Sequence, residues 1–379
     1  MDARTVLHYV KLPPTEELLT EERLNNYLML GIPLNHYIGL EISGYVHLGT
    51  GLICMQKVAD LQKAGIKTTV FLADFHSWIN RKLGGDLDVI RKVAGGYFKE
   101  ALKVSILISG GDPEKTNFVL GSEFYEKIGI TYLENIIKTA MKTTLSRMRR
   151  SISIMGRKRE EILYFSDLLY PAMQVADIFS LNVNLAHGGM DQRKAHIIAI
   201  EIGEETFGYK PVALHHHILM GLNVRKEDYL ALIDLMKSNN YDSMEDKLID
   251  LKMSKSKPDS AIFIHDSESE IKRKIINAFC PPKEVSCNPI IEIMKYVIMR
   301  HLKDECIEIL NQKTNERKKY ENYEELEHAY MNGEIHPLDL KLYVANKLME
   351  ILEPARKHFS SGYGAKCLEE MKEIMSQPN

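Results

Sequence analysis

The stretch between residues 36 and 74 constrains the fold more than any other part of the chain. Residues 36–44 form a short apolar run that ends in a Ser-Gly turn. Residues 47–51 then open a stretch with helical spacing, which Gly65 closes. The next run, residues 68–74, is β-branched and apolar, as expected of a buried strand. A strand, a helix and a strand in this order predict a βαβ unit of a parallel sheet.

The sequence His47-Leu48-Gly49-Thr50 falls at the predicted start of this helix. Backbone N–H groups and the helix dipole favour a phosphate there, and glycine lets a nucleotide approach the backbone closely. A histidine at this place is also consistent with a capping or core residue. The segment alone therefore indicates a phosphate site without establishing one.

A second segment, Lys252-Met253-Ser254-Lys255-Ser256, lies much later in the chain. Two lysines around a serine-containing turn offer cations to a polyphosphate, whose transition state gathers negative charge on its oxygens. A short basic string by itself is usually a solvated loop. Together with the helix start at His47, it favours an ATP-handling site.

These two segments resemble the signature pair of the class I aminoacyl-tRNA synthetases. Further similar stretches, between Tyr37 and about Phe359, narrow the resemblance to the archaeal and eukaryotic type of tyrosyl-tRNA synthetase; they are residues 37–41, 72–76, 121–124, 170–177, 188–194 and 336–341. The resemblance implies an α/β fold, with a Rossmann-type parallel-sheet catalytic domain and an all-α anticodon-binding domain. The expected parts are an N-terminal helical segment at 1–34, the catalytic domain at 35–282 with a helical connective insertion at about 115–165, and the anticodon-binding domain at 283–379.

Length and composition agree with this interpretation. A chain of 379 residues suggests two or three domains, and its net charge of −3 argues against a general polyanion binder. The sequence has no 18-residue apolar run and no signal-peptide pattern, so we expect a cytoplasmic protein with no membrane partner. Scattered cysteines without a CxxC pair predict reduced thiols and no zinc site. They are Cys54, Cys280, Cys287, Cys306 and Cys367.

Three polar residues predict an amino-acid pocket. Tyr170, Gln174 and Asp177 are spaced as one face of a helix. Polar groups buried on such a face need a polar partner, which a ligand with an ammonium and a hydroxyl provides. The resemblance implies that Gln192 joins the first two residues at the α-amino end of tyrosine, and that Tyr37 and Asp177 bind its phenolic hydroxyl. The expected tyrosine-binding residues are Tyr37, Phe71, His76, Tyr170, Gln174, Asp177 and Gln192.

The reaction implied by the resemblance has two steps. The tyrosine carboxylate attacks the α-phosphate of ATP, and the 3′-terminal ribose hydroxyl of tRNA(Tyr) then attacks the mixed anhydride. Catalysis by positioning and charge needs no enzyme nucleophile. Mg²⁺ arrives with ATP, and no organic cofactor or protein-bound metal is expected.

The ATP-binding residues implied by the resemblance surround the two signature segments. The expected set is Gly39, Glu41, His47, Gly49, Thr50, Lys252, Met253, Ser254, Lys255 and Ser256, with catalytic roles for His47, Thr50, Lys252 and Lys255. Thr50 replaces a second histidine that is common in the first signature. It can donate a hydrogen bond but carries no charge.

The resemblance also implies contacts with tRNA and with a second copy of the chain. Residues 138–159 carry many lysines and arginines and no acid, so they form a basic face for RNA, a solvated helix or a dimer rim. In the family this region supplies the dimer contact and receives the acceptor end. The expected tRNA-binding residues are Arg150 and Arg193 at the acceptor stem and His336 and Asp339 at the anticodon.

Two other functions stay open at this point. A tryptophanyl-tRNA synthetase is the nearest alternative specificity, and a non-catalytic tRNA-binding paralogue is supported only by Thr50. The acidic segment at about 224–251, with a helix at about 229–236, is expected to be a surface insertion; a lid or a tether of the second signature is also consistent.

Overall fold

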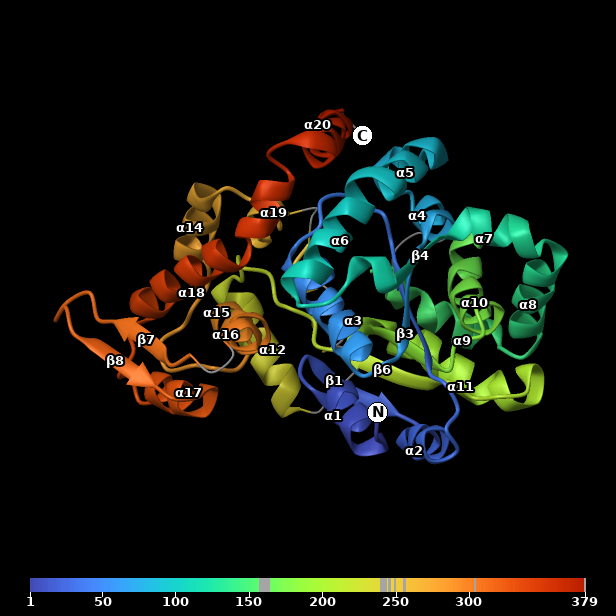
Figure 1. Cartoon of the computed structure of the whole chain (residues 1–379), viewed down its shortest axis with the longest axis horizontal. Coiled ribbons are helices and arrows are strands. Elements are labelled where there is room, and N and C mark those ends of the chain that lie inside the picture. Colours follow the sequence, from blue (N-terminus) through green and yellow to red (C-terminus); the bar gives the residue numbers. More distant parts are fainter. Residues whose placement is uncertain are drawn as a thin grey trace. The chain divides into compact units, whose positions relative to one another are not determined.

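A computed structural model describes residues 1–156, 164–238, 244, 247–248, 250–254, 257–302 and 305–377 of the chain. The chain divides into two compact units, whose elements are labelled in Figure 1. The sheet unit comprises Met1–Tyr45, Cys54–His217 and Tyr363–Asn379, and the helical unit comprises Val46–Ile53 and Ile218–Gly362. These units divide the chain differently from the predicted domains, because residues 218–282 group with the helical unit.

The sheet unit is built on a six-stranded sheet in the order β1-β6-β5-β2-β3-β4. Its strands are β1 (Thr15–Leu19), β2 (Asn35–Leu40), β3 (Lys67–Leu72), β4 (Thr116–Leu120), β5 (Leu185–Gly189) and β6 (Val212–His216). All neighbouring strands pair in parallel except β1, which pairs antiparallel with β6. Every residue of β5 and β6 is buried, as expected of a parallel sheet covered on both faces. The predicted βαβ unit is confirmed as β2, α3 (Cys54–Lys63) and β3.

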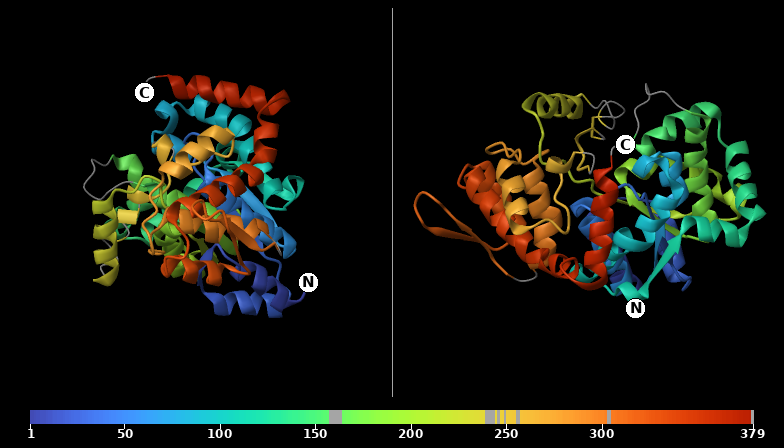
Figure 2. Two further views of the ribbon diagram at one scale, coloured as in Figure 1. Left: turned by 90° about the vertical axis from the view of Figure 1, so that its left-hand side faces the viewer. Right: turned by 90° about the horizontal axis from the view of Figure 1, so that it is seen from above.

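Helices complete the sheet unit. They are α1 (Ala3–Lys11), α2 (Glu21–Met29), α4 (Asp74–Ile79), α5 (Leu87–Val93), α6 (Lys99–Ile108), α7 (Gly121–Ile128), α8 (Ile130–Met141), α9 (Leu145–Arg150), α10 (Phe165–Ser180), α11 (Arg193–Phe207) and α20 (Gly362–Ser376). The last of these, drawn in red next to the C-terminus in Figure 2, belongs to the sheet unit again. Its Glu370 Oε2 lies 3.6 Å from Lys92 Nζ of α5.

The helical unit contains mainly helices. Its described helices are α12 (Lys226–Lys237), α14 (Glu268–Asn277), α15 (Pro289–Ile293), α16 (Met299–Leu302), α17 (Tyr323–Met331), α18 (Pro337–Ile351) and α19 (Glu353–His358). The helix expected at about 229–236 is therefore present as part of α12, while part of the 224–251 segment lies outside the described residues.

Two expectations about secondary structure were incomplete. The segment 1–34 contains α1 and α2 but also β1, an edge strand whose mostly half-buried residues give no clear alternation in the sequence. The C-terminal region is not all-α, because β7 (Ile307–Leu310) and β8 (Arg317–Tyr320) form an antiparallel hairpin. In β7 the buried residues alternate, which is the period of a strand and not of a helix.

A row of buried histidines connects neighbouring strands of the sheet. His36 Nε2 of β2 lies 3.0 Å from His187 Nδ1 of β5, and His187 Nε2 lies 2.8 Å from His216 Nδ1 of β6. His216 Nε2 in turn lies 3.6 Å from Cys54 Sγ of α3. Burial lowers the pKa of His36 to about 3 and that of His216 to about 4, and it holds the pKa of His187 well below its ordinary value. The row is therefore neutral at physiological pH.

The histidine row predicts that the folded chain loses stability as the pH falls below about 6.5, the ordinary pKa of histidine. In the unfolded chain these side chains bind protons below that pH, whereas in the fold His216 stays neutral down to about pH 4 and His36 to about pH 3. Each such histidine should lower the free energy of unfolding by up to about 1.4 kcal/mol per pH unit in this window. Urea unfolding at pH 7 and pH 5 measures the loss. A His187→Leu variant should lose less stability between the two pH values than the wild type, and a variant of the exposed His8 should behave as the wild type. Equal losses in the wild type and the His187 variant would refute this explanation.

Candidate active site

The predicted polar face lies on α10 and is buried. Tyr170, Gln174 and Asp177 are 5%, 9% and 1% exposed. The Nε2 of Gln174 donates to Oε1 of Gln192 at 3.2 Å, and Gln192 Nε2 donates to the carbonyl oxygen of Ile154 at 3.1 Å. The Oε1 of Gln174 is buried and has no hydrogen-bond partner among the described residues. A buried acceptor of this kind is unusual in a folded protein, since such groups are nearly always hydrogen-bonded.

Asp177 is held by two tyrosines. Its Oδ1 accepts hydrogen bonds from the hydroxyls of Tyr125 on α7, at 3.0 Å, and Tyr132 on α8, at 2.7 Å. The two tyrosine rings stack with their centroids 3.9 Å apart. Burial raises the pKa of Asp177 to about 7, although both tyrosine hydroxyls act to lower it. Asp177 therefore changes its protonation near neutral pH.

The other carboxylate oxygen of Asp177 lies near His76. The distance from Asp177 Oδ2 to His76 Nε2 is 3.5 Å, and burial lowers the pKa of His76 to about 3, so the imidazole is neutral. Neither ring nitrogen of His76 has a hydrogen-bond partner among the described residues. The His76 ring also meets the Tyr170 ring edge-on, with centroids 4.6 Å apart. His76 thus joins the two ends of the polar face.

Tyr37 of β2 and Phe71 of β3 extend the group of contacting residues to two neighbouring strands. Their ring centroids lie 6.1 Å apart, and the Phe71 ring lies 6.0 Å from that of Tyr125. Burial, and then the charge of Asp177, raises the pKa of the Tyr37 hydroxyl well above its ordinary value. The predicted tyrosine-binding residues are thus connected by contacts within the sheet unit.

Glu41 lies beside this group of residues. Asn80 Nδ2 donates to Glu41 Oε1 at 2.8 Å, and Lys82 Nζ lies 3.6 Å from Glu41 Oε2. Burial, and then the charge of Glu41, raises the pKa of Tyr170 well above its ordinary value. At Gly39 a Cβ would lie 3.1 Å from the Tyr37 hydroxyl, so a larger residue there would press on the tyrosine side chain.

The first signature segment belongs to the helical unit. His47 forms an antiparallel bridge with Phe263, and its Nδ1 accepts a hydrogen bond from the Gly49 N–H at 3.1 Å. Thr50 Oγ1 lies 3.5 Å from His47 Nε2. The predicted helix begins here as the π-helix η1 (Gly49–Ile53). A Cβ at Gly49 would lie 2.9 Å from His47 Cε1, so a larger residue would displace the histidine ring.

The second signature segment belongs to the same unit. Its entry is fixed by hydrogen bonds from Met253 N to Leu219 O, at 2.8 Å, and from Gly221 N to Leu251 O, at 2.7 Å. Lys252 bridges Met220, and the Met253 side chain is buried. Lys255 and Ser256 lie outside the described residues.

Comparison with known proteins identifies the family. The model of tRNA synthetases class I (W and Y) matches residues 31–353. The chain is a member of this family. The tyrosine–tRNA ligase of Thermococcus kodakarensis is 49% identical over 383 residues, which cover 99% of each chain. That of Pyrococcus horikoshii is 48% identical over 368 residues, which cover 95% of this chain and 96% of the relative.

Solved structures distinguish between the tyrosine and tryptophan specificities of this family. The tyrosyl-tRNA synthetase of Pyrococcus horikoshii, solved as a complex with L-tyrosine, is 46% identical, has a TM-score of 0.90 and covers 98% of this chain and 100% of its own. A tryptophanyl-tRNA synthetase of Aeropyrum pernix is 17% identical with a TM-score of 0.64, and shares the fold. The predicted family and α/β fold are confirmed. Because its relatives are tyrosine–tRNA ligases that are similar over almost the whole chain, this chain is assigned the same activity.

The four residues of this synthetase that were predicted to bind tRNA differ in their exposure and in their hydrogen-bond partners. Arg150 is exposed at the end of α9, whereas Arg193 Nε donates to both carboxylate oxygens of Glu17 at 2.9 Å. His336 is the N-cap of α18, where its Nδ1 accepts from the Leu338 N–H. Asp339 is 6% exposed, and its Oδ1 accepts from the Gln312 N–H at 3.2 Å. One Asp339 oxygen therefore fastens the loop after β7.

Two kinds of structural feature were sought in the described part of this synthetase, a cluster of metal-ligating side chains and a membrane-spanning helix. No group of three or more His, Cys, Asp or Glu residues there is arranged to hold a metal ion. No helix there is long and apolar enough to cross a membrane.

Sequence reasoning missed Tyr125 and Tyr132. They are seven positions apart, which suggests one helix face, but Gly129 (φ 57°) separates α7 from α8 between them. The available signal was the presence of two tyrosines, whose hydroxyls can donate hydrogen bonds, in a region expected to contact tRNA and a second copy of the chain. Their contact with Asp177 depends on the packing of three helices, which spacing in the sequence does not predict.

Removal of the Tyr132 hydroxyl should destabilise this synthetase in a pH-dependent way. A Tyr132→Phe variant should lose about 1.5–3 kcal/mol of unfolding free energy at pH 8.5, where Asp177 is ionised, and about 1 kcal/mol at pH 5.5, where it is protonated. Urea unfolding at both pH values checks this. Tyr209→Phe is the matched control, because that hydroxyl donates to the carbonyl of Ile178, which does not titrate. A Tyr132 loss that is equal at both pH values would contradict the assigned charge of Asp177.

Proposed function

We propose that this synthetase activates L-tyrosine with Mg²⁺-ATP and transfers it to tRNA(Tyr), and that Asp177 recognises the phenolic hydroxyl of the substrate. The observation that carries the proposal is the arrangement of Asp177. Its Oδ1 accepts from two tyrosine hydroxyls, and the neutral imidazole of His76 lies 3.5 Å from Oδ2. A phenolic hydroxyl that donates to Oδ2 would satisfy a buried acceptor.

The same contacts explain how phenylalanine would be rejected. Phenylalanine fits the same apolar walls but would leave Asp177 and Tyr37 buried without the hydroxyl. An unsatisfied buried polar group costs about 1–3 kcal/mol, and more when it is charged. At the other end of the substrate, the unsatisfied Gln174 Oε1 supports binding of an ammonium group, together with Tyr170 and Gln192.

The adenylate-forming step is assigned to the two signature segments. In this proposal His47 acts at the α-phosphate of ATP, Lys252 and Lys255 neutralise the leaving pyrophosphate, and Thr50 positions His47 through its hydroxyl at 3.5 Å. Lys255 and Ser256 keep these roles on sequence grounds alone, since they lie outside the described residues. Gly39 and Glu41 would contact the nucleotide, and Mg²⁺ enters with ATP as part of the substrate.

A homodimer through α8 is the proposed assembly. The helix exposes an apolar stripe on one face, formed by Ile130, Leu133, Ile137 and Met141, which are 67%, 49%, 48% and 80% exposed. A contiguous exposed stripe of this kind marks a protein interface, and a second copy would bury it by two-fold symmetry. The proposed acceptor-stem residue Arg150 follows on α9. We also propose that the protein acts in the cytoplasm, where tRNA is charged.

Tryptophan is the alternative substrate. An indole donates one hydrogen bond and has no phenolic oxygen, and the tryptophanyl relative shares only the fold. The tyrosine branch is favoured because the 49% identical relative is a tyrosine–tRNA ligase.

Amino-acid-dependent ATP–pyrophosphate exchange tests the role of Asp177. The wild type should exchange with tyrosine and not with phenylalanine or tryptophan. Asp177→Ala should lower kcat/KM for tyrosine by about 10- to 100-fold and reduce the preference over phenylalanine, because the hydrogen bond to a charged acceptor is lost. Equal exchange with tyrosine and phenylalanine in the wild type would refute the role of Asp177. Tryptophan-dependent exchange that survives Asp177→Ala would favour the alternative substrate.

Sedimentation of a Met141→Glu, Ile137→Glu variant tests the dimer. Two charges on the apolar stripe should convert a dimer to a monomer, because the carboxylates would be buried without partners. Aminoacylation of tRNA should fall more than ATP–pyrophosphate exchange does. Leu107→Glu is the control, since Leu107 is 56% exposed on α6. A variant that stays dimeric would place the interface elsewhere.

A further inference from the structure

We propose that Lys274, a buried lysine of α14, is a positioning residue for the adenylate-forming step. Lys274 holds residues 261–266 in place. This segment follows the second signature loop in the chain, and its backbone bonds to the residues around His47. The proposal rests on the proposed role of His47 in the function given above. It adds a residue that the sequence did not indicate, because lysines on helices are usually solvated.

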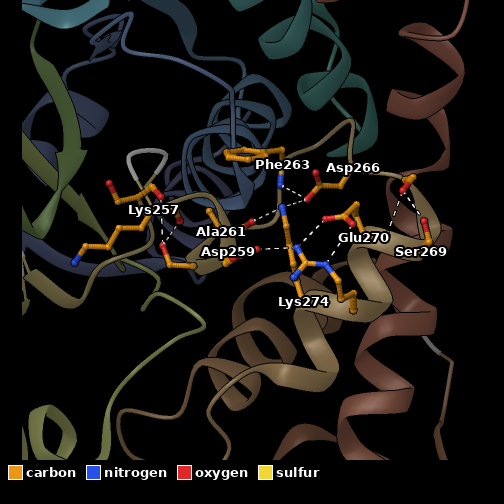
Figure 3. Close-up of polar contacts among 12 residues, drawn as sticks. Lys257, Asp259, Ala261, Phe263, Asp266, Ser269, Glu270 and Lys274 are labelled. Carbon is orange, nitrogen blue, oxygen red and sulfur yellow. Dashed lines mark hydrogen bonds and ion pairs between the residues drawn. The ribbon is translucent and has the colours of Figure 1, made fainter. Parts of the chain in front are cut away.

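The Lys274 ammonium binds both ends of residues 261–266. The side chain is 4% exposed. Its Nζ donates to Asp266 Oδ2 at 2.7 Å and to the Ala261 carbonyl oxygen at 3.0 Å, as Figure 3 shows. The same nitrogen lies 4.6 Å from the centre of the Phe263 ring, within the range of a cation–π contact. One buried cation therefore fixes the start, the middle and the end of this segment.

The segment held by Lys274 lies against the first signature. Leu48 N donates to Ile262 O at 3.0 Å, and Ile264 N donates to Val46 O at 3.1 Å. These bonds flank the bridge between His47 and Phe263. Phe263 is itself fixed, since its N–H donates to Asp266 Oδ2 at 2.9 Å (Figure 3). The backbone position of His47 therefore depends on a residue that Asp266 and Lys274 hold.

The same segment begins where the second signature loop ends. Leu222 N donates to Ser260 O at 2.9 Å, and the Ser260 hydroxyl donates to Lys257 O at 2.7 Å. The next residue, Ala261, accepts from Lys274. Lys274 thus fixes the exit of this loop as well as the partner of His47.

The Lys274–Asp266 pair is costly to break. Burial raises the pKa of Asp266, and the neighbouring Lys274 opposes that rise. Without the ammonium, the Asp266 carboxylate would be buried without its cation, so the turn at residues 263–266 should rearrange. The proposed tyrosine pocket consists of residues of the sheet unit, so tyrosine binding should not follow this rearrangement.

A Lys274→Met variant tests the proposal. In tyrosine-dependent ATP–pyrophosphate exchange, its kcat should fall by at least about tenfold, while KM for tyrosine stays within about twofold of the wild type. Equilibrium dialysis of L-tyrosine without ATP should give wild-type binding. Lys272→Met, at an exposed position of the same helix, is the matched control and should leave all three quantities unchanged. An unchanged kcat in a folded Lys274→Met protein would overturn the proposal.

Two further variants separate the possible failures. Asp266→Asn keeps an acceptor for the Phe263 N–H but removes the charge that pairs with Lys274, and it should lower kcat less than Lys274→Met while sparing tyrosine binding. It serves as the test if Lys274→Met does not fold.

A His47→Asn variant should lower kcat as Lys274→Met does. Full exchange by His47→Asn would refute the proposed role of His47, whereas impaired His47→Asn with unaffected Lys274 and Asp266 variants would refute only the positioning role. Parallel losses of tyrosine binding and kcat would identify Lys274 as a general structural residue.

Discussion

A fully buried carboxylate needs hydrogen-bond donors, and the packing around Asp177 supplies them from two tyrosine hydroxyls. Tyr125 and Tyr132 come from consecutive helices, α7 and α8; their rings stack on each other, and both hydroxyls donate to Asp177 of α10. This arrangement fixes how α7, α8 and α10 pack, because a shift of one of these helices would take at least one donor away from a buried charge. Stability and the proposed recognition of the substrate hydroxyl thus depend on the same carboxylate.

The sequence predicted the parts of the fold that depend on local pattern. The βαβ unit at residues 36–74 was correct because apolar periodicity and the glycines set it locally. The polar face of α10 was correct because three polar residues at helical spacing are rare on a buried helix. The edge strand β1 and the β7–β8 hairpin were missed, since each is short and its pairing partner lies in another part of the chain or after a loop.

The sequence indicated candidate residues where the residue type and its spacing suggest a chemistry, and it did not indicate residues whose role depends on packing. The spacing of Gln174 and Asp177 placed them on one helix, and the structure shows both buried on α10. Tyr125 and Tyr132 were missed because Gly129 breaks their helix. Lys274 was missed for another reason. A lysine on a helix is usually expected to lie in solvent, but this one lies with Ile271 and Ile275 on the buried face of α14. A lysine on an apolar helix face is the signal that was available.

The two signature segments both belong to the helical unit, although they lie far apart in the sequence. They are separated by about half of the chain, yet backbone hydrogen bonds place residues 46–48 beside residues 262–264, just after the second signature loop. The sequence identified both segments by their chemistry. It did not indicate that a third segment, from residue 261 to residue 266, connects them.

The histidine row has a direction. Each imidazole in it carries one proton, so the tautomer of one ring sets the tautomer of the next. If the protons sit on the Nε2 atoms, each ring donates toward Cys54, and His36 Nδ1 is left as a bare lone pair; it has no partner among the described residues. The reverse order would leave an N–H buried there without an acceptor, which is the more costly of the two. The row should therefore hold one tautomer throughout, with each imidazole donating from Nε2 in the direction of Cys54.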